Sequence, residues 1–481
     1  MNENKSTTRE MSKHYRRRRG RRLPKHLEVL HPDTAGIDIG AEHHYVSVPE
    51  DRGEETVRRF GCYTPQLEEM AQWLTRCGVK TVVMEATGVY WVPVFRVLES
   101  HGLQVLLVNP RHVKYVPGRK TDVADCQWLR QLHTFGLLRG AFVPPQDVAA
   151  MRTYWRQRKD LVEAASREIL HMQKALTQMN VQLHVVLSDV TGVSGMRILR
   201  AIVAGQRDPV QLAKLANSQV RSSRDEIAQA LSGHYTPEHL FVLQQALELF
   251  DVFQAKIQDC DHQLAGYLSR FETKAAPETL PPHPKRSKRT VRRKNEPHFD
   301  LRAELWRITG VDFSRIDGID SMVAFTVLSE IGFDVNAFPT EDEFVSWLGL
   351  CPNNAITGGK VKRRRTRRVF NRAADALRIS AQTLWRSKSY LGAHYRRFAA
   401  RLGAPKAITA TAHKLARIMY RALKYGHQYV DKGQQYLEQQ HHERTLKSLT
   451  KRAKELGYML VHQETGECLG AANQGLTQCV S

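Results

Sequence analysis

Residues 34–48 read T-A-G-I-D-I-G-A-E-H-H-Y-V-S-V and predict a short hairpin that contains one carboxylate. Residues 35–39 form an apolar strand, and residues 45–48 form a second apolar run after a polar link. Side chains alternate along a strand, so Asp38 faces away from its two isoleucine neighbours. A carboxylate in a strand is costly unless it is paired, hydrogen-bonded or bound to a metal. The partners of Asp38 must therefore come from elsewhere in the chain.

An alternation of strands and helices is predicted from residue 31 to about residue 145. Thr64 is placed to cap the first helix, and a buried strand carries Glu85. A hairpin meander followed by βαβ crossovers indicates an α/β domain with a mixed sheet. This order is typical of a ribonuclease-H-like fold. The predicted elements are a strand at 56–60, a helix from 64 to about 77, a strand at 80–86, a helix at 89–100 and a strand at 104–108.

A helix that begins near residue 122 carries two aspartates in its first turn. Asp122 and Asp125 lie three residues apart and therefore share one helical face. Like charges at this spacing repel each other, which makes a shared cation attractive. Arg119 and Lys120 lie just before the helix, where we expect them to meet a phosphate.

Carboxylates from two strands and this helix can converge on one cation site. Asp38, Glu85, Asp122 and Asp125 offer the oxygen ligands that Mg²⁺ prefers. Two such ions would hold a phosphodiester and stabilise its entering and leaving oxygens. Each residue alone has an ordinary explanation: a capped turn, an ion pair between Glu85 and Arg111, or helix N-terminal aspartates favoured by the dipole. As a set in this order, they predict a catalytic metal site.

The charge balance points to a polyanionic partner. Lys and Arg number 72 against 49 Asp and Glu, giving a net charge of +23. Proteins this basic bind nucleic acid, the alternative being a ribosome-like or merely soluble basic protein. No run approaches the roughly 20 apolar residues of a membrane span, and the basic N-terminus lacks the apolar core of a secretory signal. The seven cysteines form no C-x-x-C pair, which fits a cytoplasmic protein with reduced thiols.

Composition shifts divide the chain into six expected parts. The helical region has the spacing of two long antiparallel helices with shorter pieces between them. Near residues 316–332, a glycine, a small and apolar helix and a second glycine resemble one arm of a helix-hairpin-helix. The parts are a basic disordered arm (1–30), the α/β domain (31–145), a helical or coiled-coil region (146–273), a flexible basic linker (274–298), a mostly α second unit (299–430) and a polar tail (431–481).

A second candidate site lies in the second unit. Thr357-Gly358-Gly359-Lys360 combines a hydroxyl, two glycines that allow close backbone approach to a phosphate, and a positive charge. A plain loop turn before a basic helix is the alternative, because the spacing is not that of a P-loop. The basic segment 362–368 is expected to open a helix over 369–384. The residues expected to contact nucleic acid here are Gly358, Gly359, Lys360, Lys362, Arg363, Arg364 and Arg365.

These motifs together resemble the DEDD transposases of the insertion-sequence-110 family. The resemblance rests on the D-I-G strand, the M-E-A-T-G strand end at Glu85, and the K-T-D-x-x-D helix start. In the second unit it rests on W-L-G-L-C-P at 347–352 and I-T-G-G-K at 356–360, so that residues 34–429 are covered. It implies a RuvC-type domain, a coiled-coil region and a C-terminal transposase domain.

The resemblance also implies an activity and partners. Members resemble recombinases guided by a structured noncoding bridge RNA that pairs with donor and target DNA. The acidic quartet is implied to bind Mg²⁺, a serine of the second domain to attack DNA, and catalysis to be shared in a homo-oligomer, a dimer or tetramer. Here Thr357 stands where that serine is usual, with Ser346 and Ser380 as fallback hydroxyls.

The sequence therefore predicts a bacterial, nucleoid-associated DNA transposase. Asp38, Glu85, Asp122 and Asp125 would hold Mg²⁺, and Thr357 would form a covalent protein–DNA ester. One alternative is a RuvC-like nuclease that cuts branched DNA with activated water. Another is a scaffold that binds RNA or DNA through its charge alone.

Overall fold

The computed structural model describes residues 27–113, 122–284, 294–367, 369–426, 433–463 and 468–469. Its contacts divide the chain into two compact units, Met1–Val143 and Pro144–Ser481. The second unit of the structure is therefore longer than the predicted second unit at 299–430, and the name refers to Pro144–Ser481 from here on. Each unit has its own core, and each is described by itself.

The first unit is built on a five-stranded mixed sheet in the order β3-β2-β1-β4-β5. The first three strands form an antiparallel meander, while β1, β4 and β5 run parallel, as the predicted ribonuclease-H-like order requires. The strands are β1 Thr34–Ile39, β2 His43–Ser47, β3 Val57–Gly61, β4 Thr81–Glu85 and β5 Gln104–Val108. The helices are α2 Thr64–Arg76, α3 Trp91–Ser100, α4 Pro110–Val113 and α5 Asp122–Thr134.

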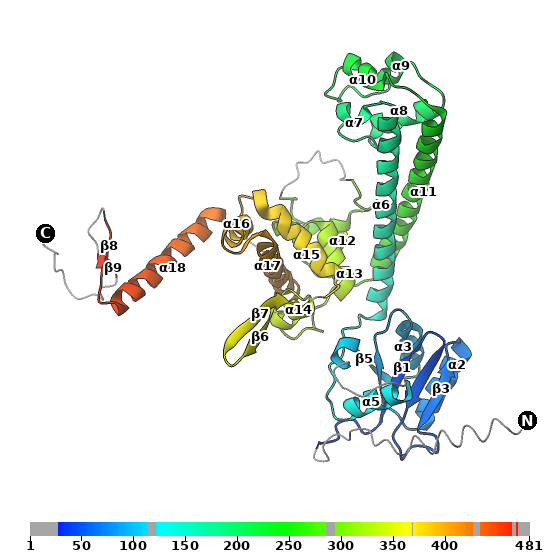
Figure 1. The fold of residues 1–481 in the computed structure, drawn as a ribbon, viewed down its shortest axis with the longest axis vertical. Helices are drawn as coiled ribbons and strands as arrows, with labels where there is room; N and C mark the ends of the chain where they lie inside the picture. The colour runs from blue at the N-terminus through cyan, green and yellow to red at the C-terminus, as the bar shows by residue number, and fades with distance from the viewer. Residues whose placement is uncertain are drawn as a thin grey trace, which may run out of the picture. The chain divides into compact units, whose positions relative to one another are not determined.

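Helices cover both faces of this sheet (Figure 1). On one face, Ile37 and Met84 pack in a core that includes Leu67 and Met70 of α2 and Leu98 of α3. On the other face, a smaller core joins Val83 and Val108 of the sheet to Leu129 and Leu132 of α5. One detail differs from expectation. Thr64 is the first residue of α2 and not its cap, because Tyr63 precedes the helix in an extended conformation and proline stands in its first turn.

Helix α5 approaches β1 with no side chain between them at Gly36. A Cβ atom at Gly36 would overlap the carbonyl oxygen of Cys126 and lie 2.5 Å from the amide nitrogen of Arg130. The hydrogen bond from Arg130 Nε to Ser47 Oγ (3.1 Å) fastens the same helix to β2. Glycine is therefore required at this position by the closeness of helix and strand.

The second unit begins with two long antiparallel helices, α6 Gln146–Gln178 and α11 Pro237–Leu268 (Figure 1). Tyr267 near the end of α11 donates a hydrogen bond to Asp147 at the start of α6, which fixes their opposite directions. Between them lie short helices that share a core with both. Coiled-coil packing of the pair stays a prediction. The short helices are α7 Leu183–Val186, α8 Val193–Val203, α9 Pro209–Lys214 and α10 Arg224–Leu231.

The rest of the second unit is mostly helical, as predicted, and is centred on α13. Seven of the eleven residues of α13 are buried, and its neighbours include α6, α12 and α15. The elements are η1 Pro277–Thr279, α12 Leu301–Thr309, η2 Phe313–Arg315, α13 Ser321–Ile331, α14 Glu341–Trp347, β6 Pro352–Thr357, β7 Lys360–Thr366, α15 Arg372–Thr383, η3 Leu384–Arg386, α16 Tyr390–Leu402, α17 Ala404–Tyr425, α18 Gly433–Glu455, β8 Leu460–Val461 and β9 Cys468–Leu469.

Side-chain contacts join α6 to α13. Arg156 donates two hydrogen bonds to the buried carboxylate of Glu330, at 2.9 and 2.6 Å. Trp155 stacks edge-on against Phe325 and donates its indole N–H to Thr326. The long helical pair is therefore packed onto the central helix of the second unit.

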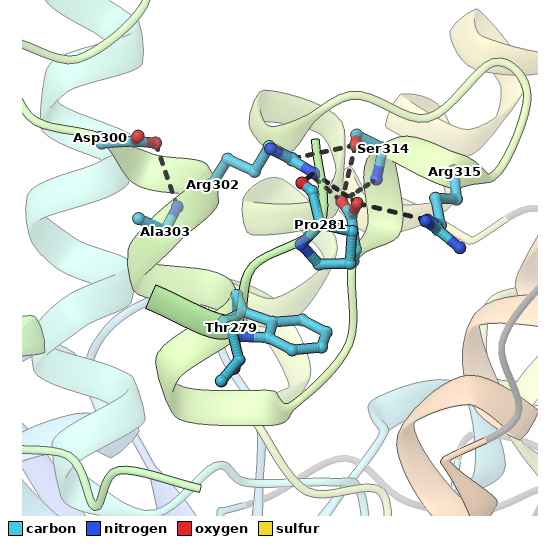
Figure 2. A network of polar contacts seen from close by, with 9 residues as sticks. Thr279, Pro281, Asp300, Arg302, Ala303, Ser314 and Arg315 are labelled. Carbon is cyan, nitrogen blue, oxygen red and sulfur yellow. Dashed lines mark hydrogen bonds and ion pairs between the residues drawn. The ribbon is translucent and has the colours of Figure 1, made fainter. Parts of the chain in front are cut away.

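The first part of the expected flexible linker is packed against α12. Arg302 donates a hydrogen bond of 2.7 Å to the carbonyl oxygen of Pro281, and its guanidinium also binds Asp312 (Figure 2). Trp306 donates its indole N–H to the carbonyl oxygen of Ala276 and the hydroxyl of Thr279. Side chains of α12 thus donate hydrogen bonds to backbone carbonyl oxygens within residues 276–281. The composition of this segment did not predict such packing.

A third difference from expectation concerns the basic segment. Residues 362–366 do not open a helix, because they belong to β7, which pairs with β6 in an antiparallel hairpin. The following helix, α15, begins only at Arg372, after Asn371 caps it through a side-chain hydrogen bond to Ala374. Among the helices in the described part of the chain, none is both long and apolar enough to cross a membrane.

Substitution of Gly36 tests the contact between α5 and β1. Gly36→Val should lower the free energy of unfolding by about 1–3 kcal/mol, because the added atoms would overlap the backbone of α5. Thermal unfolding of the full chain measures the effect. Gly53→Ala is the matched control, since the nearest atom to its added Cβ is 3.9 Å away. An unfolding temperature of Gly36→Val equal to that of the parent protein would contradict the close approach.

Candidate active site

Asp38 and Glu85 lie at the ends of two neighbouring parallel strands. The register pairs Ile37 of β1 with Met84 of β4, and Asp38 and Glu85 are the next residues on each strand. Residues paired across parallel strands point to the same face, so both carboxylates leave the sheet on one side. Both are partly exposed, in contrast to the buried residues that precede them. The sequence prediction that these two residues share a site is consistent with this register.

The face that carries both carboxylates is the one that α5 covers. Asp38 lies two residues after Gly36, and Glu85 two residues after Val83, which packs against Leu129 of α5. Alternation along the strands therefore directs both side chains toward α5.

The first turn of α5 brings two further carboxylates to this side of the sheet. Asp122 is exposed, whereas the Oδ1 atom of Asp125 is buried. Cys126 follows directly, and its backbone is the part of α5 that contacts Gly36. Burial, together with the negative charge of Asp38, raises the pKa of the Cys126 thiol to about 12. This influence of Asp38 on Cys126 agrees with the direction of the Asp38 side chain toward α5.

The carboxylates do not form a complete ligand set by themselves. Oxygen donors on one face have the chemistry of a site for a hard divalent cation. Among the residues that the structure describes, however, no group of three or more His, Cys, Asp or Glu side chains is arranged to hold a metal ion. The predicted phosphate contacts Arg119 and Lys120 lie outside the described residues, as does the rest of 114–121.

Thr357 lies at the tip of the β6–β7 hairpin. It pairs with Lys360, and Gly358 and Gly359 form the two-residue turn between them, with φ of 55° and 73°. Two successive positive φ angles are the signature of a type I′ turn, which glycine adopts without strain. Every residue of β6 is exposed. The glycines thus form the turn of a hairpin that presents a threonine hydroxyl and a lysine to solvent.

Basic side chains cover the returning strand of the hairpin. Lys360, Lys362, Arg363 and Arg365 are exposed on β7, and the side chain of Arg364 lies outside the described residues. A two-stranded ribbon of this kind is narrow enough for the major groove of a DNA duplex. Sequence reasoning named these cations but missed the ribbon. The signal was present, because two glycines between alternating residues are a strong hairpin indication.

The two fallback hydroxyls are differently placed. Ser380 is 1 % exposed on the inner side of α15, which keeps its hydroxyl from any external substrate. Ser346 accepts a hydrogen bond of 3.0 Å from Arg367. Thr357 is therefore the most accessible of the three hydroxyls considered from the sequence.

The proposed helix-hairpin-helix arm also has a defined structure. Gly318 takes a positive φ of 86° before α13, as a glycine turn should. The side chain of Asp320, however, caps α13 by accepting a hydrogen bond from the amide of Val323. A carboxylate at this position occupies one backbone amide and would repel a phosphate, so this helix start is a weak phosphate site.

Two protein-family models match the chain. Residues 35–181 match the DEDD model of the IS110 group, described as a transposase, and residues 312–396 match the model described as the transposase IS116/IS110/IS902 family. Both matches support an IS110-family DEDD transposase. No curated protein matches it.

The two matches contain both candidate sites of this transposase. The first spans the sheet, α5 and the whole of α6, including all four carboxylates. The second runs from η2 into α16 and includes the hairpin with Thr357. DEDD transposases generally use divalent metal ions. A transposase acts on DNA, which agrees with the net charge of +23.

Proposed function

We propose that this transposase cuts and rejoins DNA strands with the carboxylates of its first unit and the hydroxyl of Thr357, guided by a noncoding RNA. The observation that supports it most is the β1–β4 register, which sets Asp38 beside Glu85. The contact at Gly36 adds the first turn of α5, with Asp122 and Asp125, to the same face.

Asp38, Glu85, Asp122 and Asp125 would hold the divalent cation, with Mg²⁺ preferred by their oxygen donors. The bound cation would polarise a phosphodiester and stabilise charge on its oxygens. Asp38 and Glu85 leave neighbouring rigid strands, so their separation is fixed by the sheet. Asp122 and Asp125 sit on a helix that is pressed against β1, which limits their movement relative to the strands.

Thr357 would be the nucleophile. Its Oγ forms a bond to phosphorus while the bond from phosphorus to the 3′ oxygen breaks, and the departing oxygen becomes a 3′ hydroxyl as the threonine hydroxyl loses its proton. In the reverse direction, a 3′ hydroxyl of a new strand attacks the phosphothreonine ester and releases Thr357. Lys360, its pairing partner across the turn, is placed to offset the charge that develops on the phosphate. Threonine carries the same hydroxyl as serine, with a stiffer χ1.

The proposals of a guide RNA and of an oligomer come from the resemblance of this chain to its family. A net charge of +23 exceeds what one short duplex contact needs, which favours a second polyanion such as a structured RNA. We propose that donor and target DNA are selected by this RNA and that a homo-oligomer, a dimer or tetramer, carries out exchange.

Neutralising the carboxylates should abolish strand cleavage without loss of DNA binding. Asp38→Asn and Glu85→Gln should each lower the cleavage rate by about 100-fold or more, because a charged group at the reacting phosphate is lost. Cleavage of labelled DNA in Mg²⁺ measures the rate, and a gel-shift assay measures binding. Glu99→Gln is the control, since Glu99 is an exposed carboxylate on α3, on the other face of the sheet. Parent-like cleavage by Asp38→Asn would exclude the site.

A covalent adduct should depend on the hydroxyl of residue 357. Thr357→Ala should form no protein–DNA adduct on a denaturing gel, whereas Thr357→Ser should restore it. Thr366→Ala is the matched control, because Thr366 lies at the other end of the same hairpin. Cleavage without any adduct in the parent protein would instead favour a nuclease that uses water.

A specific RNA should accompany the purified protein. Sequencing of the RNA that copurifies should return one structured species encoded beside the transposase gene, with segments complementary to donor and target DNA. A mixture that reflects cellular RNA abundance would argue against a dedicated guide.

A further inference from the structure

Phe370 is the most exposed of the large apolar side chains that the structure describes, at 92 %. Single exposed apolar residues are ordinary on protein surfaces. Here both neighbours are anchored. A Cβ atom on Gly349 would lie 2.8 Å from Val369 Cγ2, so Val369 packs directly on that glycine. Asn371 is buried, and its side chain caps α15. The phenyl ring is thus held in solvent from a fixed backbone position.

This ring stands at the foot of the basic hairpin. Both ends of the hairpin lie near the end of α14. There Val369 packs on Gly349, and Arg367 donates a hydrogen bond to the hydroxyl of Ser346. Phe370 directly follows Val369 at this junction. An apolar ring beside a strand of exposed lysines and arginines has the composition of a nucleic-acid surface, on which bases stack and phosphates pair with cations.

We infer that Phe370 stacks on a base of the substrate DNA at the foot of the β6–β7 hairpin, while exposed cations of β7 such as Arg363 and Arg365 pair with phosphates of the same strand. A phenyl wedge unstacks neighbouring bases and kinks a duplex, which opens the strands where exchange must occur. The inference rests on DNA binding by this transposase and deepens the proposed function. It does not require Thr357 to be the nucleophile.

Photocrosslinking and binding of the full chain test this role. The probe is a duplex that covers the end of the insertion sequence encoding the protein, with thymines replaced in turn by 5-iodouracil, which crosslinks to stacked aromatic rings. We expect one position to crosslink to Phe370, as mapped by mass spectrometry. Phe370→Ala should weaken binding about 5- to 100-fold, and Phe370→Trp should retain it. An abasic site at the crosslinked position should remove the difference between Phe370→Ala and the parent protein.

Two controls separate this role from folding and from catalysis. Phe241→Ala removes a comparable ring, 63 % exposed on α11, and should leave binding unchanged. All measurements are repeated with Asp38→Asn, in which cleavage should be absent and the effect of Phe370 should persist. Equal DNA affinity of Phe370→Ala and the parent protein would overturn the inference, as would a loss confined to RNA binding or an abasic site that leaves the difference intact.

Discussion

The packing of a helix backbone directly on a strand backbone at Gly36 determines the geometry of the first unit. The carbonyl of Cys126 and the amide of Arg130 occupy the space that any side chain at residue 36 would fill. Because Asp38 follows two residues later on the same face, the contact that seats α5 also sets the distance between the strand carboxylates and those of the helix. A longer spacer at residue 36 would lift Asp122 and Asp125 away from the sheet. The candidate active site therefore depends on a residue that has no side chain.

In the second unit, buried ion pairs determine how the helices are positioned. Arg158 and Asp261 pair between the two long helices with almost no exposure to solvent, and Asp261 also accepts a hydrogen bond from the amide of His298. Removal of one partner would leave a buried charge without its counter-ion, which is costly. Together with Arg156 and Glu330, these contacts fix the helical pair to itself and to α13. Directional ion pairs thus set the alignment of long helices whose apolar surfaces alone would allow sliding.

The parts of the fold that follow from local periodicity could be predicted from the sequence. The strands of the first sheet and the long helices have patterns that depend on neighbouring residues, and the predicted strand at 104–108 matches β5 in full. The candidate carboxylates could be named because each stands at a strand end or helix start. Whether these carboxylates come together around a metal could not be predicted, because it depends on distances in the folded structure. The described residues show no completed ligand group. The hairpin was missed for another reason: Gly358 and Gly359 fit a phosphate loop as well as a tight turn, and the basic strand resembled the start of a helix.

The glycine turn of the hairpin has a further consequence for access. Beyond Thr357 and Lys360, the tip consists of bare peptide backbone. Such a tip is thinner than any ending that carries side chains, so it can enter a gap between two nucleic-acid backbones that would exclude a bulkier loop. Next to this tip stands the hydroxyl of Thr357, the proposed nucleophile.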